Sequence, residues 1–401
     1  MTRPVLAEKD HIALPAARND FAARVVRSMF TRSGAVAGAI WIGTLALIAV
    51  FAPFLANTHP LLLSEQGAWS SPMLHHLTSV DVALLGVSVL CLGTLLWRGP
   101  LKLRLGFLVV ASGVVIGISA IFIQPPELTV FEQYREKEAT GAYDWVIRAP
   151  IPYSAQDYLR DRREVGLQAP LSNAHHTHWL GTEENGADVL SRIIHASRIA
   201  LSIGFVATGI AMIIGVALGG LMGYFSGRVD LLGMRLVEIF ESVPTLFLLL
   251  TFVAFFGRSL YMMMVIIGLT GWTGYARFAR AEFLRLRQQD FVQAAIACGL
   301  PLQSILFRHI LPNAMAPLIV SASFGVASAI LAESSLSFLG LGLVDAPSWG
   351  QMLNQSVKSS VFNWWMAVFP GGAIFFTMFA YNMLGEALRD ALDPHLNNGN
   401  S

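Results

Sequence analysis

Charged residues are scarce in this sequence. Asp, Glu, Lys and Arg make up 13% of its 401 residues, whereas hydrophobic residues make up 54% and the mean hydropathy is +0.57. A water-soluble core needs far fewer apolar residues, so this composition excludes an ordinary soluble protein and predicts a membrane protein. The formal net charge of +1 gives no reason to expect nucleic acid as a partner.

Cysteine is also rare, and a nucleotide-binding loop is missing from the sequence. Cys91 lies in an apolar run and Cys298 in a basic loop, so we expect no disulfide between them. No Gly-x-x-x-x-Gly-Lys-Ser/Thr segment occurs, so we do not expect the chain to bind ATP itself. About thirty mostly polar and basic residues precede the first apolar run, which we therefore expect to stay as an anchor and not to be cleaved.

Long apolar runs are abundant. A helix needs about 20 apolar residues to cross a bilayer, and about eight runs reach or approach that length. The sequence therefore predicts an all-α polytopic membrane protein with about eight transmembrane helices. The predicted spans are 34–56, 80–97, 105–123, 199–224, 231–256, 260–278, 313–343 and 362–388.

Basic residues predict the orientation of these spans, because Lys and Arg in short connections resist translocation. They are frequent before the first span and after the second, fourth and sixth, whereas the connection 57–79 contains none. An even number of spans with both termini in the cytoplasm satisfies this bias. The residues that carry it are Arg18, Arg24, Arg27, Arg32, Arg98, Lys102, Arg104, Arg228, Arg235, Arg277, Arg280, Arg285, Arg287 and Arg308.

The connection 277–312 is long, basic and patterned as two short helices around a break. Gly299, Leu300 and Pro301 interrupt the helical period. A glycine at a helix end can take positive φ, and proline suits the first turn of the next helix. The pattern predicts a helix–turn–helix lever outside the membrane.

The residues of this connection also resemble a known family element. Gln293, Ala294, Ala295 and Gly299 are followed by the group His309, Leu311, Pro312 and Asn313. This spacing resembles the EAA loop of ABC-importer permeases, in the His-x-Leu-Pro-Asn form of the dipeptide and oligopeptide branch. The resemblance implies that the loop couples to a separate ATP-binding subunit, with small alanines at the contact and a turn at Gly299. Gln293 stands where the wider family has Glu, which weakens any salt bridge to the ATPase.

Flanking segments match the same family in the same order. Residues 178–192, His-Trp-Leu-Gly-Thr-Glu-Glu-Asn-Gly-Ala-Asp-Val-Leu-Ser-Arg, resemble the segment that leads into the permease core, with Ala187 where that pattern has Arg. Residues 223–230, 235–244, 333–342 and 347–350 resemble later segments. The likeness covers about 178–394, and within the family it is nearest to the C-type subunit of the dipeptide, oligopeptide and nickel importers.

The resemblance implies a function and a domain organisation. The chain would be the inner-membrane permease subunit of an ATP-driven peptide importer, without a cofactor and without catalysis of its own. Its partners would be a second homologous permease, ABC ATPase subunits, an extracytoplasmic solute-binding protein and the lipid bilayer. The expected parts are a cytoplasmic segment 1–33, a first span 34–56, an extra hairpin 57–123, an extracytoplasmic segment 124–197, a type I permease core 198–388 and a cytoplasmic tail 389–401.

Ionisable residues within spans are costly, so they face protein or water. Glu333, with Ser334 and Ser337 beside it, is a candidate for the translocation path, or for a buried hydrogen bond at a helix contact. Glu238 and Glu241 lie nearer the cytoplasm, and we interpret them as interfacial ion pairs with Arg235 and Arg277 or as a gate.

Other functions have less support in the sequence. His175, His176 and His178 could suggest a metal site, and nickel importers belong to the same branch, but histidines so close together cannot all reach one ion comfortably. We expect solvated loop histidines and no metal, with the same expectation for His75 and His76. An ion-coupled secondary transporter should show two related halves, which the sequence lacks. An intramembrane hydrolase would need a base near a nucleophilic serine.

Overall fold

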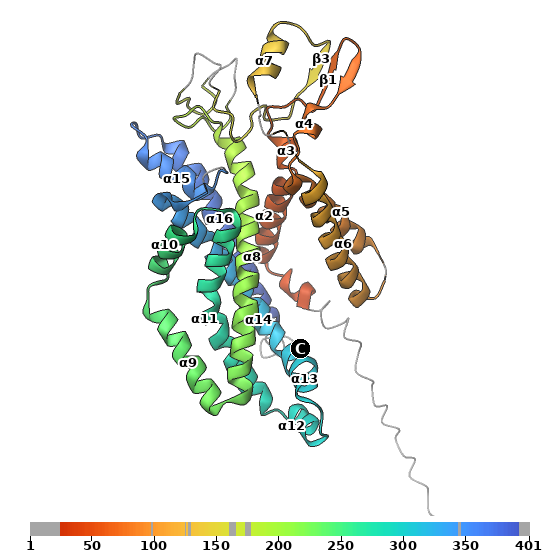
Figure 1. Cartoon of the computed structure of the whole chain (residues 1–401), viewed down its shortest axis with the longest axis vertical. Coiled ribbons are helices and arrows are strands. Elements are labelled where there is room, and N and C mark those ends of the chain that lie inside the picture. The colour runs from red at the N-terminus through yellow and green to blue at the C-terminus, as the bar shows by residue number, and fades with distance from the viewer. Residues whose placement is uncertain are drawn as a thin grey trace, which may run out of the picture.

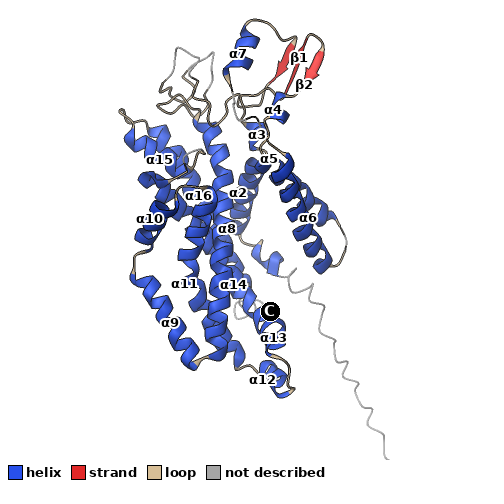
Figure 2. Ribbon diagram, viewed as in Figure 1, coloured by secondary structure: helices blue, strands red, loops and turns tan. Residues whose placement is uncertain are grey.

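The computed structural model describes residues 25–97, 99–124, 126, 130–159, 166–172, 178–343 and 346–392. Arg18, Arg24, Arg98, His175 and His176, named above, lie outside the described residues, as does most of the tail. Over the described part the protein is helical apart from three short strands, which confirms the all-α class (Figure 1, Figure 2). The elements are α2 (Ser33–Val50), α3 (Ala52–Leu55), β1 (Leu62–Glu65), β2 (Ala68–Ser70), α4 (Pro72–His75), α5 (Ser79–Leu96), α6 (Leu101–Phe122), α7 (Glu132–Ala139), β3 (Trp145–Ile147), α8 (Val189–Phe225), α9 (Gly227–Ser242), α10 (Thr245–Phe256), α11 (Leu260–Arg287), α12 (Asp290–Ala297), α13 (Leu302–Ser304), η1 (Ile305–Ile310), α14 (Leu311–Leu336), η2 (Ser337–Leu341), α15 (Trp349–Lys358) and α16 (Trp364–Leu392).

Helices occupy all of the predicted spans, and the predicted number of about eight is approximate. Among the described residues, six helical stretches are long and apolar enough to cross a membrane. A seventh exists only if α9 and α10 form one span, and these two helices bend by 81°. The predicted span 231–256 is therefore a bent pair of helices and not one straight helix. The bend has a local cause, because Pro244 disfavours the helical conformation at Val243, which is extended.

The helix α11 contains the predicted span 260–278 and continues to Arg287. Its last turns carry Arg285 and Arg287, and its 28 residues are long enough to cross a bilayer, although it is less apolar than the six stretches above. The helix α11 packs along α8. The helix α8 begins at Val189, ten residues earlier than predicted. Asp188 caps this start, because its carboxylate accepts a hydrogen bond from Ser191 N at 2.7 Å.

The contact between α8 and α11 depends on a row of glycines on α8. Gly215, Gly219 and Gly223 recur every four residues, so they lie on one helix face. A Cβ on Gly215 would lie 2.7 Å from the carbonyl oxygen of Trp272, and one on Gly223 would lie 2.6 Å from that of Arg280. The two backbones therefore touch, as small-residue interfaces in membranes allow.

The pair α5 and α6 stands beside the bundle and packs mainly on itself (Figure 1). Thr78 and Asp81 begin α5 with a capping box, in which each side chain accepts from the other's backbone N–H. Only 6% of either span is buried, so most of the hairpin surface is left for the bilayer or a partner.

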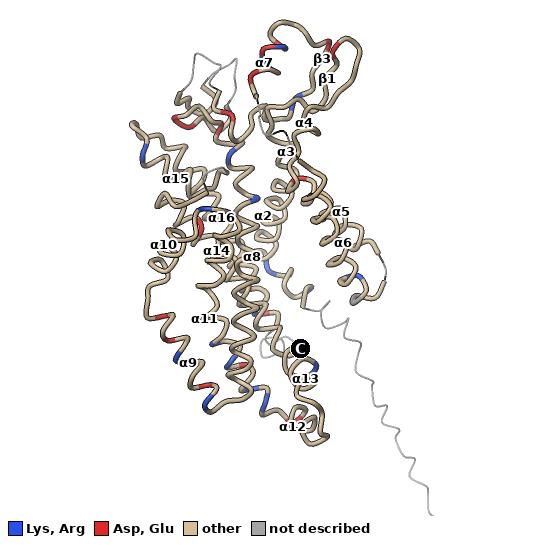
Figure 3. Tube along the Cα trace, in the orientation of Figure 1, with Lys and Arg blue, Asp and Glu red and all other residues tan. Residues whose placement is uncertain are grey.

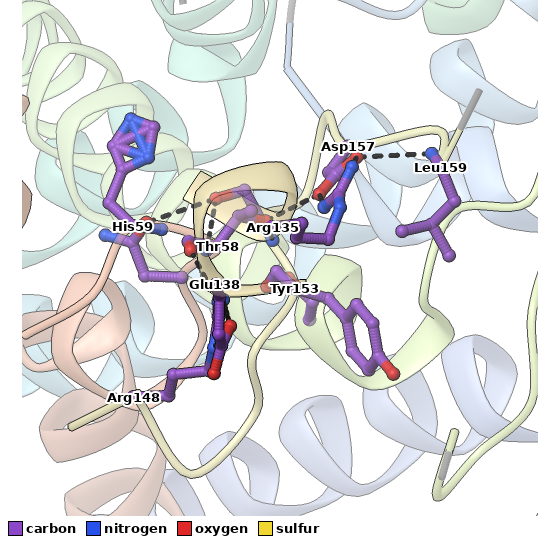
Figure 4. Close-up of polar contacts among 11 residues, drawn as sticks. Thr58, His59, Arg135, Glu138, Arg148, Tyr153, Asp157 and Leu159 are labelled. Atoms are coloured by element: carbon purple, nitrogen blue, oxygen red, sulfur yellow. Dashed lines mark hydrogen bonds and ion pairs between the residues drawn. The ribbon is translucent and has the colours of Figure 1, made fainter. Parts of the chain in front are cut away.

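A small outer sheet lies beyond the membrane helices, with strand order β2-β1-β3. Residues 57–77, grouped above with the hairpin, supply β1, β2 and α4 to it, while β3 comes from the external segment. Figure 4 shows the polar contacts that join these two stretches: the Thr58 hydroxyl donates to Asp157 at 2.7 Å, and Arg135 pairs with the same carboxylate. Arg148 contributes a further bond to the Thr58 carbonyl at 3.2 Å. The external segment is thereby tied to the end of α3.

Charged residues gather at the two ends of the molecule, with few along its middle (Figure 3). Arg32, just before α2, forms an ion pair with Asp390 near the end of α16. The start of the first described span and the end of the last one therefore lie on the same side of the membrane helices. The outer sheet and the α12–α13 turn lie at opposite ends (Figure 1).

Candidate functional site

The predicted helix–turn–helix lever is present. The helix α12 ends at Ala297, Gly299 has φ +71°, and Pro301 forms the N-cap of α13. Positive φ strains any residue with a Cβ, so glycine is the residue that this turn requires. The turn lies in open space, with no atom of the described residues within 4 Å of where a Cβ on Gly299 would be.

The α12–α13 tip exposes apolar side chains. Val292 and Ala295 are buried against the bundle, whereas Ala294 faces solvent. The exposed apolar residues of the tip are Phe291, Ile296, Leu300, Leu302 and Phe307. Exposed apolar side chains grouped at a charged end of a membrane protein are typical of a protein contact.

Gln293 has a partner within the chain. Its Nε2 donates to the carbonyl oxygen of Arg287 at 2.8 Å, which satisfies one of the free carbonyls at the end of α11. The Arg287 guanidinium in turn donates to the carbonyl of Tyr224 at 2.6 Å, at the end of α8. The lever is thus connected to both long helices. Glutamate, which the family has here, could not donate this bond when ionised.

Replacing Gln293 with Glu is expected to loosen α12. The loss of one hydrogen bond at a helix end costs about 1 kcal/mol, so the amides of α12 should exchange roughly fivefold faster with solvent deuterium. Hydrogen exchange of the purified protein measures this. Gln303→Glu, an exposed change of the same kind on α13, is the control and should leave α12 unchanged. Equal protection in both variants would contradict the role of the Gln293 amide.

The His309-x-Leu311-Pro312-Asn313 group forms the entry to α14. Pro312 has no N–H for the carbonyl four residues earlier, and the chain accommodates it with a turn of π-helix over Ile305–Ile310. The side chain of Asn313 donates to the His309 carbonyl at 2.6 Å, so this carbonyl has a partner. These residues fix the angle between the lever and the membrane helix.

A cavity of about 340 Å³ lies between α8, α10, α11 and α14. Its lining is mostly small and is uncharged among the described residues. Hydroxyl groups supply its polar side-chain atoms: Thr208, Thr245, Thr270, Tyr275, Ser321 and Ser328. Sequence reasoning missed them. The available signal was the helical spacing of Ser321, Gly325, Ser328 and Ala332, which places small residues on one face of α14.

A second cavity, of about 550 Å³, adjoins the first on the side nearer the lever. Ser321 and Phe324 line both cavities, so Phe324 lies where they meet. Glu282, Arg285 and Arg389 give this second cavity a charged rim. Together the cavities follow α14 from its middle toward the lever.

Glu333 is buried and does not line either of these two cavities. Ser337 Oγ donates to its carboxylate at 2.6 Å and Ser334 Oγ at 3.4 Å. Gly350 packs so closely on the Ser334 backbone that a Cβ would overlap it. Of the two interpretations above, this geometry favours the buried hydrogen bond at a helix contact.

Glu238 and Glu241 lie on α9, toward the charged end. Glu238 pairs with Arg235 at 2.6 Å, and Glu241 pairs with Arg277 of α11. These side chains are between about a third and two thirds exposed, so the pairs add little stability. The second pair joins α9 to α11; its role as a gate stays a prediction.

The segment before α8 holds a buried polar cluster. Glu183 pairs with Arg192 at 3.0 Å, and His178 Nδ1 pairs with Asp188 at 2.8 Å under the stacked ring of Tyr153. The expectation of solvated histidines is therefore wrong for His178, because Asp188 and Tyr153 enclose it. Burial raises the pKa of Glu183 to about 7. Among the described residues, no cluster suited to a metal ion occurs.

Comparison with known proteins places this arrangement in a family. Residues 215–398 match the binding-protein-dependent transport system inner membrane component family. The inner membrane ABC transporter permease protein YejE of Escherichia coli K12 is 32% identical over 351 residues, which cover 87% of this chain and 89% of that protein. The chain belongs to this family. The permease is also 39% identical to the oligopeptide transport system permease protein OppC of Haemophilus influenzae over 218 residues, which cover 54% of this chain and 70% of OppC. It is 36% identical to the dipeptide transport system permease protein DppC of Alkalihalophilus pseudofirmus over 251 residues, which cover 62% of this chain and 81% of DppC.

Membership confirms the resemblance drawn from the loop residues. The permease is a transporter subunit of the inner membrane, and membership does not favour the ion-coupled alternative. The match with YejE covers far more of the chain than the matches with OppC and DppC, so it takes in part of the region before the shared core.

Proposed function

We propose that the permease forms half of a translocation path for peptides and transmits ATP hydrolysis from a separate ATPase through α12 and the turn that follows it. A second permease completes the path, and a solute-binding protein delivers the peptide on the outer side. We propose peptides and not nickel as the cargo, because two relatives, OppC and DppC, are named as peptide transport permeases.

The observation that carries this proposal is the α12–α13 tip. It stands outside the membrane helices, turns at a glycine with φ +71°, and exposes apolar side chains beside small Ala294. Those properties suit docking into a groove on another protein. The hydrogen bond from Gln293 to Arg287 would pass a movement of the tip to α11, and through Arg287 to α8.

The path proposal uses the two cavities along α14. Hydroxyl groups can exchange hydrogen bonds with the amide groups of any peptide, and an uncharged wall gives no strong trap for a charged side chain. The basic lever end is assigned to the cytoplasm by the excess of Arg in its connections, so both termini lie inside and the outer sheet lies outside.

A pull-down with a matched glycine pair tests the coupling proposal. Gly299→Val puts a β-branched residue at positive φ, which costs on the order of 1–2 kcal/mol in the turn and changes its shape. The tagged wild-type protein in mild detergent is expected to retain an ATPase with vanadate-sensitive ATP hydrolysis, and Gly299→Val is expected to lose most of it. Immunoblots and phosphate release measure both.

Gly67→Val is the control for this experiment. Gly67 has φ +79° and equally open surroundings, but it lies in the turn between β1 and β2 of the outer sheet. The same strain on the other side should leave the ATPase bound. An ATPase that is absent from the wild type, or retained equally by Gly299→Val, would refute the proposal.

A further inference from the structure

A cavity of about 380 Å³ lies beside the outer sheet, next to the N-terminal parts of α5 and α8. Its walls come from the extra hairpin, from α8 and from the residues that follow α3. It lies apart from the α14 cavities and has no part in the proposed path. It is therefore a site that transport as proposed above leaves unused.

Arg198 of α8 supplies the main polar feature of this cavity. One guanidinium nitrogen, Nη1, pairs with Asp81 Oδ1, but Nε and Nη2 are buried and have no partner among the described residues. The other oxygen of Asp81 already accepts from the backbone and hydroxyl of Thr78, both at 2.7 Å. Asp81 therefore cannot satisfy the remaining N–H groups of Arg198.

His59 adds a second unpaired group beside the cavity. Its ring is buried, its Nδ1 has no partner in the described part of the chain, and it lies 3.8 Å from the ring of His76, centroid to centroid. Figure 4 shows the His59 ring turned away from the contacts of Thr58. Burial and the neighbouring His76 lower the pKa of His59 to about 4, so this imidazole is neutral and can donate one N–H.

Unpaired buried donors destabilise a protein, and more so when they belong to a charged group. An oxygen-rich ligand that entered the cavity would remove this cost. The planar fork of arginine matches the paired oxygens of a phosphate. Asp81 offsets the charge of Arg198, so a phosphodiester in a zwitterionic molecule suits the site better than a free dianion.

Apolar side chains also line the cavity, on the side of the two helices. Val80, Leu84 and Ile199 line it on the two helices below the polar groups. Val80 is exposed, and the surface of α5 beyond these residues is exposed and apolar, including Val89 and Leu92. A ligand with a phosphate at one end and hydrocarbon at the other satisfies both parts.

We propose that this cavity binds a phospholipid, with the headgroup phosphate on Arg198 and an acyl chain along Val80 and Leu84. The lipid then fills the space between the extra hairpin and the permease core, and it joins two parts that have few contacts of their own. The α5–α6 hairpin thereby acts as one wall of a lipid site. The proposal rests on the membrane location of the chain and not on its cargo.

Native mass spectrometry of the complete protein, with phosphatidylethanolamine titrated into mild detergent, tests the site. The wild type is expected to retain one tightly bound lipid. Arg198→Met should weaken that lipid at least tenfold, since a charge-assisted contact contributes about 1.5–3 kcal/mol. Arg258→Met, which removes an exposed arginine that does not line this cavity, is the matched control and should bind as the wild type does.

Leu84→Trp keeps the test decisive if Arg198→Met fails to fold. It fills the apolar end of the cavity and leaves the Asp81–Arg198 pair intact, so it should also displace the lipid. Equal lipid retention in wild type, Leu84→Trp and Arg198→Met would overturn the proposal. Three other outcomes would also overturn it. The wild type could retain no lipid, millimolar inorganic phosphate could displace the lipid, or a dipeptide could occupy the site in preference to the lipid.

Discussion

Replacing Gly219 with valine is expected to lower the free energy of unfolding by about 3 kcal/mol and to abolish accumulation of folded protein. A Cβ at this position would overlap the carbonyl oxygen of Ala276 and lie 2.9 Å from the Cβ of Ala279. Neither neighbour can rotate away, because one is backbone and the other has no further side-chain atoms. The helices α8 and α11 would have to separate along their whole contact.

Gly209→Val separates packing from helix propensity. Gly209 lies on the same helix, and in the described part of the chain no atom lies within 4 Å of where its Cβ would be. Both changes replace glycine with valine in a helix, so the intrinsic propensity term is the same. Denaturant unfolding in mixed micelles measures the difference. Equal stabilities would mean that the glycine row on α8 does not hold the two helices together.

The position of the helices was predictable because insertion into a bilayer leaves a strong composition signal. A run of about 20 apolar residues has few alternatives to a spanning helix, and each predicted span reaches or approaches that length. The bend between α9 and α10 was readable from Pro244, yet the apolar run continued past it and masked the break. The glycine row on α8 was equally visible at its four-residue spacing, but a spacing alone does not say which helix lies against it.

The coupling turn was predictable for a different reason. Gly299 and Pro301 have restricted roles in the backbone, so their order in the sequence specifies a helix end followed by a helix start. The partner of Gln293 was not predictable, since Arg287 O becomes available only after α11 ends and the chain reverses. A comparison with the family Glu suggested a lost salt bridge, whereas the amide has its own bond within the chain.

The burial of single side chains could not be predicted from the sequence, for a third reason. Glu333 attracts attention because a carboxylate in a span is rare, but whether it faces a cavity or serines depends on helix rotation. Small neutral residues such as Ser321 and Ser328 give no such signal in the sequence, although they line the cavity along α14. The three-stranded outer sheet joins residues about eighty positions apart, and no local pattern in strands of three or four residues records that pairing.

Glu183 carries the prediction for pH dependence. Its carboxyl is buried beside Arg192 and Asp188, and burial raises its pKa from 4.5 to about 7, against the lowering effect of Arg192. The folded protein therefore holds this proton more tightly than the unfolded chain does. The stabilisation that this gives is complete below pH 4.5 and is lost as the pH rises through 7, at about 1.4 kcal/mol per unit of pKa shift.

Glu183→Gln is accordingly expected to flatten the pH profile of thermal stability. Glutamine imitates the protonated carboxyl at every pH, so the melting temperature of the variant should match the wild type near pH 4.5 and exceed it above pH 7. Differential scanning fluorimetry in detergent across this range measures both curves. Glu184→Gln changes the exposed neighbour, which accepts from Ser360 at 2.9 Å, and should keep the wild-type slope. A slope that survives in Glu183→Gln would contradict the role of Glu183 in this pH dependence.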